Sequence, residues 1–290
     1  MSKKVLSLLC ALLLVVSTIG LAACGKSNNT TTNTSTNNSS TSATSSLKTL
    51  TPGKLTVATG QPAYSPWVEN NDPASGKGFE AALAYKIAEK MGFKDSDVVW
   101  VRTDFDAAIA PGPKTFDFNL QQYSVTPERE KAVDFSTPYY TTTQAIVTLS
   151  SSKYASATSL ADFSGAKIGA ASASTSLTLA QKLFGSSVAP FNDNDTAVQA
   201  LKVNQIDAIV VDMPTAWYIT TGELTSPASK IVGQLPSEGT AGDNLAALLP
   251  KGSPLTSSVS KAIDELKSDG TLAQLEKQWL LSGGNIPVLK

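Results

Sequence analysis

Short apolar runs alternate with helical patterns over most of this chain, and this alternation restricts the possible folds more than any other feature of the sequence. Runs rich in β-branched residues are typical of strands, whereas apolar residues recurring every three or four positions are typical of helices. The predicted strands are residues 54–59, 98–101, 145–147, 167–170 and 207–211. The predicted helices are residues 79–91, 175–184, 196–204, 255–268 and 272–281. This order predicts an α/β fold in which helices cover the sheets.

The first 50 residues do not share this pattern. Lys3 and Lys4 precede an apolar run over residues 5–19, and small residues lead up to Cys24, which is typical of a signal peptide over residues 1–23. The run is shorter than the roughly 20 apolar residues of a membrane span. The following segment is almost wholly Ser, Thr and Asn, so residues 24–50 are predicted to form a flexible tether. About 240 residues remain, which suits two lobes of about 120 each.

The composition excludes several classes of function. The chain has no histidine, which removes the commonest general base and zinc ligand and excludes a Ser-His-Asp system. Both cysteines, Cys10 and Cys24, lie near the N-terminus, so no disulfide joins parts of the folded region. The formal net charge of −1 gives no basic face for nucleic acid. We expect a monomer that has no metal or other cofactor and no nucleic-acid partner.

The most informative stretch is residues 124–130, Ser-Val-Thr-Pro-Glu-Arg-Glu, followed by residues 133–140, Val-Asp-Phe-Ser-Thr-Pro-Tyr-Tyr. It resembles the signature of the polar amino-acid substrate-binding proteins of bacterial ABC transporters, the extracellular solute-binding family 3. Other stretches agree with that family in order and spacing: residues 62–67, 78–80, 207–214 and 270–272, and Trp279. The resemblance covers nearly all of the predicted folded region.

This resemblance implies a two-lobe fold of the periplasmic-binding-protein type II. Two crossover strands would join the lobes, and the ligand would lie in the cleft between them. The first lobe would hold residues 51–142 and 241–290, and the second lobe residues 143–240. The crossings would lie near residues 144–146 and 244–246.

Residues 21–24 resemble the lipobox of bacterial lipoproteins. In that class the cysteine becomes the first residue and carries the lipid, so Cys24 is the predicted lipidation site, with an ordinary buried cysteine as the alternative. Two or more acyl chains would hold such a protein stably on a membrane. The resemblance therefore implies a lipoprotein on the extracytoplasmic face of the cell membrane, which delivers its ligand to an ABC permease.

Two charged side chains suit a free amino acid. Arg129 offers a planar fork that binds a carboxylate with two parallel hydrogen bonds, and by resemblance it is the carboxylate clamp. A surface ion pair with a neighbouring glutamate is the alternative. Asp212 follows a predicted buried strand and could accept from the ligand ammonium group or cap a helix. Ser174 and Thr175 begin a predicted helix, where free N–H groups attract a carboxylate, although N-capping alone also explains them.

The rest of the predicted site is neutral. Tyr64 and Phe105 could be aromatic walls or core residues, Ser124 adds a hydroxyl, and three glutamines stand where the family commonly has acidic or small residues. The complete predicted ligand site is Gln61, Tyr64, Phe105, Gln121, Gln122, Ser124, Arg129, Ser174, Thr175 and Asp212. Its only full charges, Arg129 and Asp212, match those of an amino-acid backbone. The sequence therefore predicts a polar neutral amino acid as ligand.

Two other functions remain open. An enzyme on the same fold, such as a cyclohexadienyl or arogenate dehydratase, would need an acid or base in the cleft. Glu80 and Asp106 are the only nearby candidates, and neither has a visible partner, so we predict a binding protein without catalytic residues. Residues 192–195, Asn-Asp-Asn-Asp, suggest calcium, but the glycine and distal glutamate of an EF-hand loop are missing. A loop with a helix cap is the better interpretation of that stretch.

Overall fold

The computed structural model describes residues 47–236, 242–280 and 285–290. The predicted signal peptide, Cys24 and most of the predicted tether lie outside these residues. Within the described ranges, no helix has both the length and the apolar character needed to cross a membrane.

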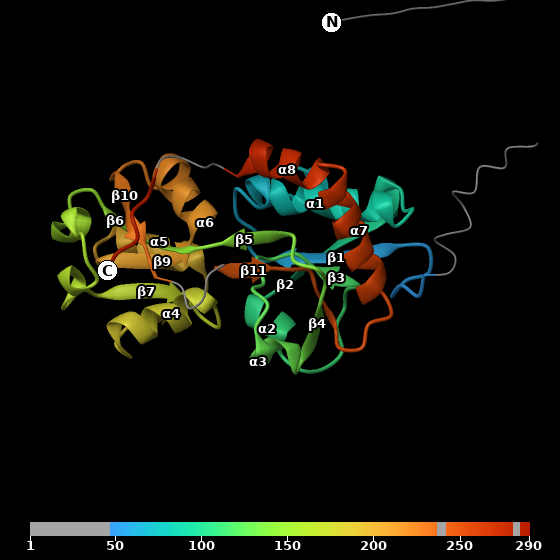
Figure 1. Cartoon of the computed structure of the whole chain (residues 1–290), viewed down its shortest axis with the longest axis horizontal. Helices are drawn as coiled ribbons and strands as arrows, with labels where there is room; N and C mark the ends of the chain where they lie inside the picture. Colours follow the sequence, from blue (N-terminus) through green and yellow to red (C-terminus); the bar gives the residue numbers. More distant parts are fainter. Residues whose placement is uncertain (1–46, 237–241, 281–284) are drawn as a thin grey trace, which may run out of the picture. The chain divides into compact units, whose positions relative to one another are not determined.

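The first lobe is built on a five-stranded sheet in the order β2-β1-β3-β12-β4. Its strands are β1 (Leu55–Gly60), β2 (Val98–Thr103), β3 (Phe118–Asn119), β4 (Val133–Phe135) and β12 (Leu248–Pro250). Its helices are α1 (Phe79–Lys90), α2 (Phe105–Ile109), α3 (Pro127–Glu130), α7 (Thr256–Ser268) and α8 (Thr271–Trp279). β1 is parallel to β2 and β3, whereas β12 is antiparallel to its neighbours. Figure 1 shows α1, α7 and α8 gathered on one side of this sheet.

The helices of the first lobe bury one apolar face against the sheet. Leu83 and Ile87 lie four residues apart on α1, and with Ile263 of α7 they pack on Leu55 and Val57 of β1. All five side chains are fully buried. Helical and strand periodicities thus meet in a single core.

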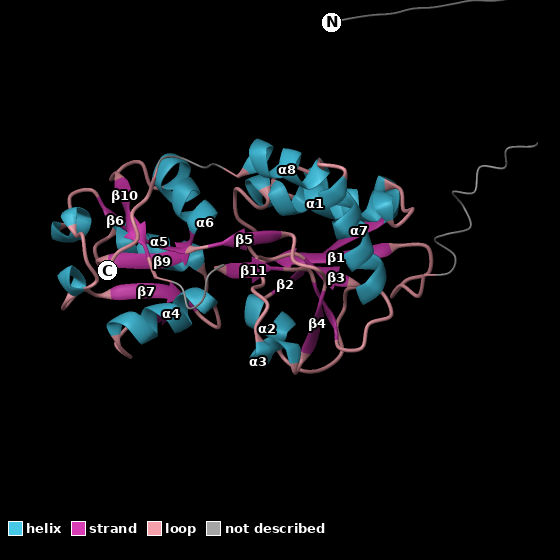
Figure 2. Ribbon diagram, in the orientation of Figure 1, coloured by secondary structure: helices cyan, strands magenta, loops and turns pink. Residues whose placement is uncertain are grey.

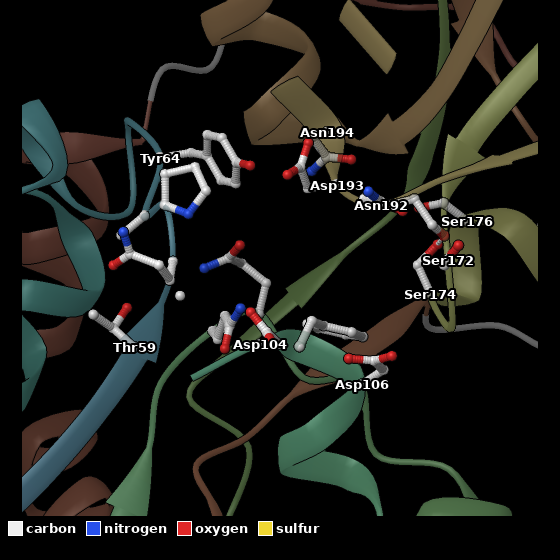
Figure 3. A pocket seen from close by; sticks show the side chains of 18 of the residues that line it. Thr59, Tyr64, Asp104, Asp106, Ser172, Ser174, Ser176, Asn192, Asp193 and Asn194 are labelled. Atoms are coloured by element: carbon white, nitrogen blue, oxygen red, sulfur yellow. Dashed lines mark hydrogen bonds between the residues drawn. The ribbon is translucent and has the colours of Figure 1, made fainter. Parts of the chain in front are cut away.

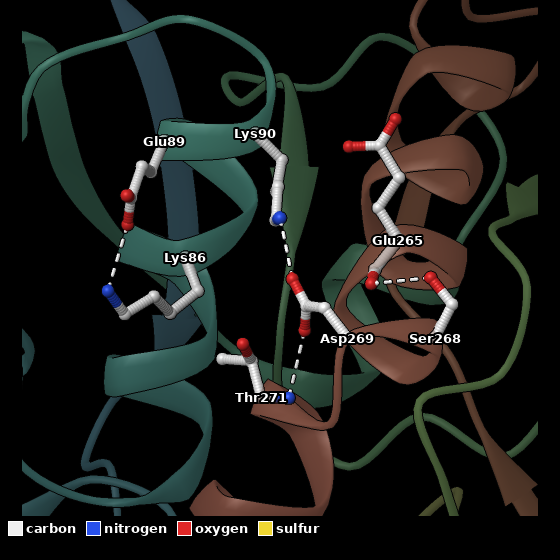
Figure 4. Close-up of polar contacts among 7 residues, drawn as sticks. All are labelled: Lys86, Glu89, Lys90, Glu265, Ser268, Asp269 and Thr271. Carbon is white, nitrogen blue, oxygen red and sulfur yellow. Dashed lines mark hydrogen bonds and ion pairs between the residues drawn. The ribbon is translucent and has the colours of Figure 1, made fainter.

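A polar contact fixes the junction of these helices. Lys90, at the end of α1, forms a 2.6 Å ion pair with Asp269 in the turn between α7 and α8. The same carboxylate accepts a 2.9 Å hydrogen bond from the backbone N–H of Thr271 at the start of α8 (Figure 4). The ammonium group and this N–H lower the pKa of Asp269 well below its usual value. One carboxylate therefore ties the ends of three helices together.

The second lobe is built on another five-stranded sheet, in the order β10-β6-β9-β7-β8. Its strands are β6 (Gln144–Leu149), β7 (Ile168–Ala171), β8 (Ala189–Phe191), β9 (Ala208–Asp212) and β10 (Ser229–Gln234). Its helices are α4 (Thr175–Phe184), α5 (Asn194–Lys202) and α6 (Met213–Tyr218). Alternate residues of β9 face opposite cores, since Ile209 packs with α5 while Val210 packs with α4. Burial on both faces explains the continuous apolar run at this strand.

Two antiparallel strands, β5 (Tyr140–Thr142) and β11 (Asp243–Leu245), form a separate pair between the two sheets (Figure 2). β5 leads directly into β6, and β11 leads back toward β12. The two-lobe α/β fold with two crossover strands is therefore confirmed. At Gly242, φ is +73°, and a Cβ atom would lie 2.2 Å from the Thr142 carbonyl oxygen. Only glycine suits this position at the crossing.

The structure differs from the predicted lobe boundaries at the C-terminus. Residues 285–290 were assigned with the first lobe, but they lie along β10 of the second. The backbone N–H of Leu289 donates to the Gln234 carbonyl, and the N–H of Gln234 donates to the Pro287 carbonyl. Leu289 is buried in the core shared with α4. The predicted boundary is therefore wrong for this segment, whose single buried leucine gave no periodic pattern to detect.

Candidate functional site

A cavity of about 470 Å³ lies between the lobes, where the carboxyl ends of the parallel strands meet. Its walls come from the segments that follow β1, β2 and β3 of the first lobe and β7, β8 and β9 of the second. Ligands of open α/β sheets bind at this edge. All ten residues of the predicted site line the cavity: Gln61, Tyr64, Phe105, Gln121, Gln122, Ser124, Arg129, Ser174, Thr175 and Asp212.

Arg129 brings a buried guanidinium to the boundary between the lobes. Its position follows from α3, a single helical turn whose N-cap, Thr126, accepts from the Arg129 N–H. The guanidinium donates to the Ser124 carbonyl at 2.7 Å and to the Ala173 carbonyl of the second lobe at 2.9 Å. Burial lowers its pKa, although nearby anionic groups oppose that effect. Arginine has five N–H donors, so the group keeps capacity for an anionic ligand.

Phe105 and Tyr123 form a stacked aromatic pair beneath the arginine. Their ring centres are 4.6 Å apart, and Cζ of Arg129 lies 5.4 Å from the centre of the Phe105 ring. The Tyr123 hydroxyl donates to the side-chain carbonyl of Gln121 at 2.9 Å. The rings thus support the guanidinium while fixing the orientation of one pocket amide.

Glu80 holds the loop that contains Gln121 and Gln122 in place. Gln122 has a φ of +52°, a backbone conformation that residues other than glycine rarely adopt. The fully buried Glu80 carboxylate compensates by accepting from the Gln122 backbone N–H at 2.8 Å, from the Gln122 side-chain amide and from the Tyr139 hydroxyl. Burial raises the pKa of Glu80 to about 7 despite these three donors. Glu80 is thus a structural anchor of the loop and does not line the cavity.

The second lobe contributes the start of α4 and the end of β9. Ser174 is the N-cap of α4, because its hydroxyl accepts from the Leu177 N–H at 3.0 Å. Asp212 ends β9, and its carboxylate accepts from the side-chain amide of Gln144 at 2.6 Å. Burial raises the pKa of Asp212 to about 7, with a smaller effect from the Asp243 carboxylate, while the Gln144 amide and Arg129 act in the opposite direction.

Three carboxylates that are not part of the predicted ligand site also line the cavity. Asp104 and Asp106 lie on one side of it, and Asp193 lies on the opposite side beside Tyr64 (Figure 3). The statement that Arg129 and Asp212 are the only full charges is therefore wrong. Asp193 was missed because it follows β8, a three-residue strand too short to predict, whose end would have placed it at this edge.

Asp193 also corrects the predicted start of α5. The helix was expected to begin at Thr196, after a cap within residues 192–195, but it begins at Asn194. Asp193 is the N-cap, accepting from the Thr196 N–H at 2.7 Å. This capping supports the helix-cap interpretation of the stretch over calcium binding. Among the described residues, no group of three or more Asp, Glu or Cys side chains is arranged to hold a metal ion.

The aromatic residues near the cavity have different roles. Tyr64 is half-buried against the cavity, and its hydroxyl has no hydrogen-bond partner among the described residues. Burial, together with the neighbouring Asp193 carboxylate, raises the pKa of Tyr64. Trp67 is instead a core residue of the first lobe, packed on Phe79 and Tyr140. Its indole N–H donates to the Thr215 hydroxyl of the second lobe at 3.0 Å.

The family profile of the bacterial extracellular solute-binding proteins, family 3, matches residues 55–282 of the chain. That range includes both lobes and every residue named above as part of the cavity. The chain belongs to this family.

A probable histidine-binding protein of Campylobacter jejuni is 35% identical over 165 residues, which are 56% of this chain and 62% of that protein. The chain thus spans about three fifths of that relative's length. The structure of an ancestral arginine-binding protein bound to glutamine superimposes with a TM-score of 0.66 at 32% identity, covering 79% of this chain and 98% of the other. An ancestral amino-acid-binding protein, a precursor of cyclohexadienyl dehydratase, gives a TM-score of 0.64 at 28% identity, with 79% and 96% covered.

The buried Glu80 makes a specific contribution to the pH dependence of stability. Its pKa is about 7 in the folded protein against an ordinary value of 4.5. Between these values the folded protein holds a proton that the unfolded chain has released, so this contribution to stability decreases as pH rises. From pH 4.5 to pH 7.5, Glu80→Gln should gain roughly 2–3 kcal/mol in free energy of unfolding relative to the unsubstituted protein.

Urea unfolding of both proteins at several pH values measures this difference. The matched control is Glu89→Gln, because Glu89 is an exposed side chain on the same helix that forms a surface ion pair with Lys86. If the difference between the unsubstituted protein and Glu80→Gln is the same at pH 5 and pH 7.5, Glu80 does not titrate in this range.

Proposed function

We propose that this protein is the substrate-binding component of an ABC importer, which captures an α-amino acid between its lobes and delivers it to a permease. The observation that carries the proposal is the placement of Arg129 and Asp212 in one interlobe cavity. An α-amino acid has one carboxylate and one ammonium group, and both need a charged partner when buried. Membership of a solute-binding family supports the same function.

The ligand carboxylate binds Arg129 and the start of α4. One guanidinium N–H group holds the Ser124 carbonyl of the same lobe, so the group is fixed before the ligand arrives, and a second N–H group reaches the Ala173 carbonyl when the lobes are together. The N–H groups at the start of α4, a ten-residue helix, add partial positive charge on the other side. The ligand ammonium group binds the Asp212 carboxylate, which the Gln144 amide orients.

Ligand binding stabilises the closed arrangement of the lobes. Polar contacts join the lobes directly: Arg129 with the Ala173 carbonyl, Ser124 with Thr175 at 3.2 Å, and Trp67 with Thr215. A ligand held by Arg129 from one lobe and Asp212 from the other adds contacts that exist only when the lobes are together. Hinge motion about β5 and β11 then couples binding to closure.

The cavity favours a cationic side chain over a neutral one. After the ligand ammonium group neutralises Asp212, the carboxylates of Asp104, Asp106 and Asp193 still face the cavity. Two of the three glutamine amides of the predicted site are partly occupied, since Gln121 accepts from Tyr123 and Gln122 donates to Glu80. Relatives named as histidine-binding and arginine-binding support this choice. Arginine or lysine therefore replaces a polar neutral amino acid as the expected ligand.

A binding protein is favoured over a dehydratase, although one ancestral relative is a precursor of such an enzyme. Glu80, one of the two candidate acids, is held by three donors and does not line the cavity. Asp106, the other, is exposed at the cavity and accepts from the adjacent Ala107 N–H at 2.8 Å. An exposed carboxylate of this kind lacks the enclosed setting that adjusts a catalytic acid.

The membrane attachment is also part of the proposal. The signal peptide over residues 1–23 would be removed, and lipidated Cys24 would hold the domain through the Ser/Thr/Asn tether. A tether of about 25 residues reaches about 25–30 Å on average. The domain would therefore stay close to the outer face of the membrane and near its permease.

Loss of the Arg129 fork should weaken ligand binding. Arg129→Ala removes the carboxylate partner and should cost roughly 2–5 kcal/mol of binding free energy. Arg129→Lys should also bind poorly, because an ammonium group does not reproduce two parallel hydrogen bonds. Isothermal titration calorimetry with the tightest amino acid measures both, and exposed Lys131→Ala on the same segment is the control. Affinity near that of the unsubstituted protein would remove Arg129 from the site.

Ligand selectivity should follow the cavity carboxylates. In a thermal-shift screen followed by calorimetry, arginine and lysine should bind more tightly than glutamine, and glutamate should bind least. Asp193→Asn keeps the helix cap, since Asn and Asp cap about equally well, and should weaken arginine binding about tenfold relative to glutamine, which is about 1.4 kcal/mol. Asp95→Asn, the same charge change at an exposed site away from the cavity, should change neither. Tightest binding of glutamine or asparagine would favour the neutral ligand instead.

Substitution of the lipobox cysteine should release the protein from membranes. Cys24→Ala removes the predicted acceptor of the lipid, whereas Cys10→Ala changes a residue inside the predicted signal peptide and should have no effect on anchoring. Partitioning of both variants into a detergent phase distinguishes them. Partitioning of Cys24→Ala with the detergent would contradict the lipoprotein assignment.

A further inference from the structure

A single buried amide lies between two carboxylates at the base of the cavity. Gln144 is the first residue of β6, and only 4% of it is exposed. Its side-chain NH₂ donates to Asp212 at 2.6 Å and to Asp243 at 3.0 Å. Its side-chain carbonyl accepts from the Ser176 hydroxyl at 2.6 Å. Both amide hydrogens are used, so the orientation of Gln144 is fixed.

Asp243 is a residue of the hinge. It is the first residue of β11, one of the two crossover strands, and is paired with Thr142 of β5. Besides the Gln144 amide of the second lobe, its carboxylate accepts from the Ser124 hydroxyl of the first lobe at 3.4 Å. Asp243 does not line the ligand cavity, and no motif in the sequence marked it. Its contacts nevertheless join Ser124, a cavity residue of the first lobe, to Gln144, which holds the cavity residue Asp212 of the second lobe.

We propose that Asp243 is a positioning residue of the ligand site, which through the shared Gln144 amide orients the Asp212 carboxylate and adds a second negative charge behind the ligand ammonium group. This inference rests on the proposed function, in which Asp212 binds that ammonium group. Two carboxylates share one neutral donor group, and Arg129, a cation that acts on both, is engaged with carbonyls and faces the ligand carboxylate. A bound ammonium group would supply the missing positive charge.

The charge surroundings of Asp212 decide how this arrangement responds to pH. The groups that face it are Arg129 of α3, Asp243 of β11, Glu80 of α1 and the phenols of Tyr139 and Tyr140. Burial raises the pKa of Asp212 to about 7, Asp243 and Glu80 act in the same direction, and Arg129 and Gln144 oppose them. An ammonium ligand needs the ionised carboxylate, so its affinity should fall by up to about tenfold per pH unit below pH 7.

The test compares the unsubstituted protein with Asp243→Asn, which has the same shape and one charge less. Carbon NMR of the labelled side chain follows the titration of Asp212 without ligand, and calorimetry with arginine from pH 5.5 to pH 8.5 follows binding. The pKa of Asp212 should be lower in Asp243→Asn. Near pH 8.5 the variant should bind several-fold more weakly, and this deficit should shrink or reverse by pH 5.5.

Two further variants separate positioning from simple structural support. Asp243→Glu keeps the charge and should keep the pH profile of the unsubstituted protein, whereas Asp243→Ser should follow Asp243→Asn. Asp95→Asn controls for net charge. The inference would be overturned if the ratio of the arginine affinities of Asp243→Asn and the unsubstituted protein is constant with pH. It would also be overturned if the pKa of Asp212 is the same in both proteins. If no amino acid binds at any pH, the proposed function fails, and the NMR titration still decides whether Asp243 acts on Asp212.

Discussion

A guanidinium buried at the boundary between two lobes needs oxygen partners, and the arrangement of this cavity depends on how Arg129 finds them. Its donors reach a carbonyl of each lobe, Ser124 and Ala173. Neutral carbonyls satisfy hydrogen bonds but leave the charge uncompensated, which is costly in a buried position. The Phe105 ring at 5.4 Å offsets part of this cost. In the proposed function a carboxylate ligand would compensate the rest, and the binding preference would then follow from the burial of one residue.

The carboxylates of the site are held by different means, and this gives them different roles. Glu80 accepts three hydrogen bonds and supports the left-handed backbone of Gln122, so it is a part of the scaffold. Asp193 caps α5 with part of its carboxylate and still lines the cavity. Asp212, the last residue of β9, accepts a hydrogen bond from one side-chain amide and also lines the cavity. Only carboxylates of the second and third kind have capacity for a ligand.

The regular elements could be predicted from the sequence, because their periodicity spans several turns or a full strand. The helix predicted over residues 175–184 has those bounds as α4, with Ser174 as its N-cap and Gly185 directly after it. The two-residue β3 and the three-residue β5, β8 and β11 carry too few residues for a periodic pattern, and their existence is set by tertiary pairing. The segment at Leu289 was assigned to the wrong lobe for the same reason.

The part of the candidate site that could be predicted is the part that the family resemblance implied. Ten predicted residues line one cavity, yet the carboxylates that decide its charge were missed, because their roles depend on which strand ends meet. The stretch of residues 192–195 reads as a loop with a helix cap in the sequence, and Asp193 is the residue that caps the helix. Its second role follows from the position of β8 beside β7. Composition gave no warning, since a net charge of −1 for the whole chain is compatible with a strongly acidic cavity.

The side chains that form polar contacts between the lobes are held in place by neighbouring residues. Trp67 is held among Phe79 and Tyr140 in the core of the first lobe, so its N–H meets Thr215 without losing further side-chain freedom. Arg129 is likewise fixed by Ser124 before it reaches Ala173. On the hinge side, Gln144 and Asp243 are fixed by each other. Because these groups are ordered in advance, the contacts that a ligand adds in the proposed function would contribute mainly to closure rather than to ordering the site.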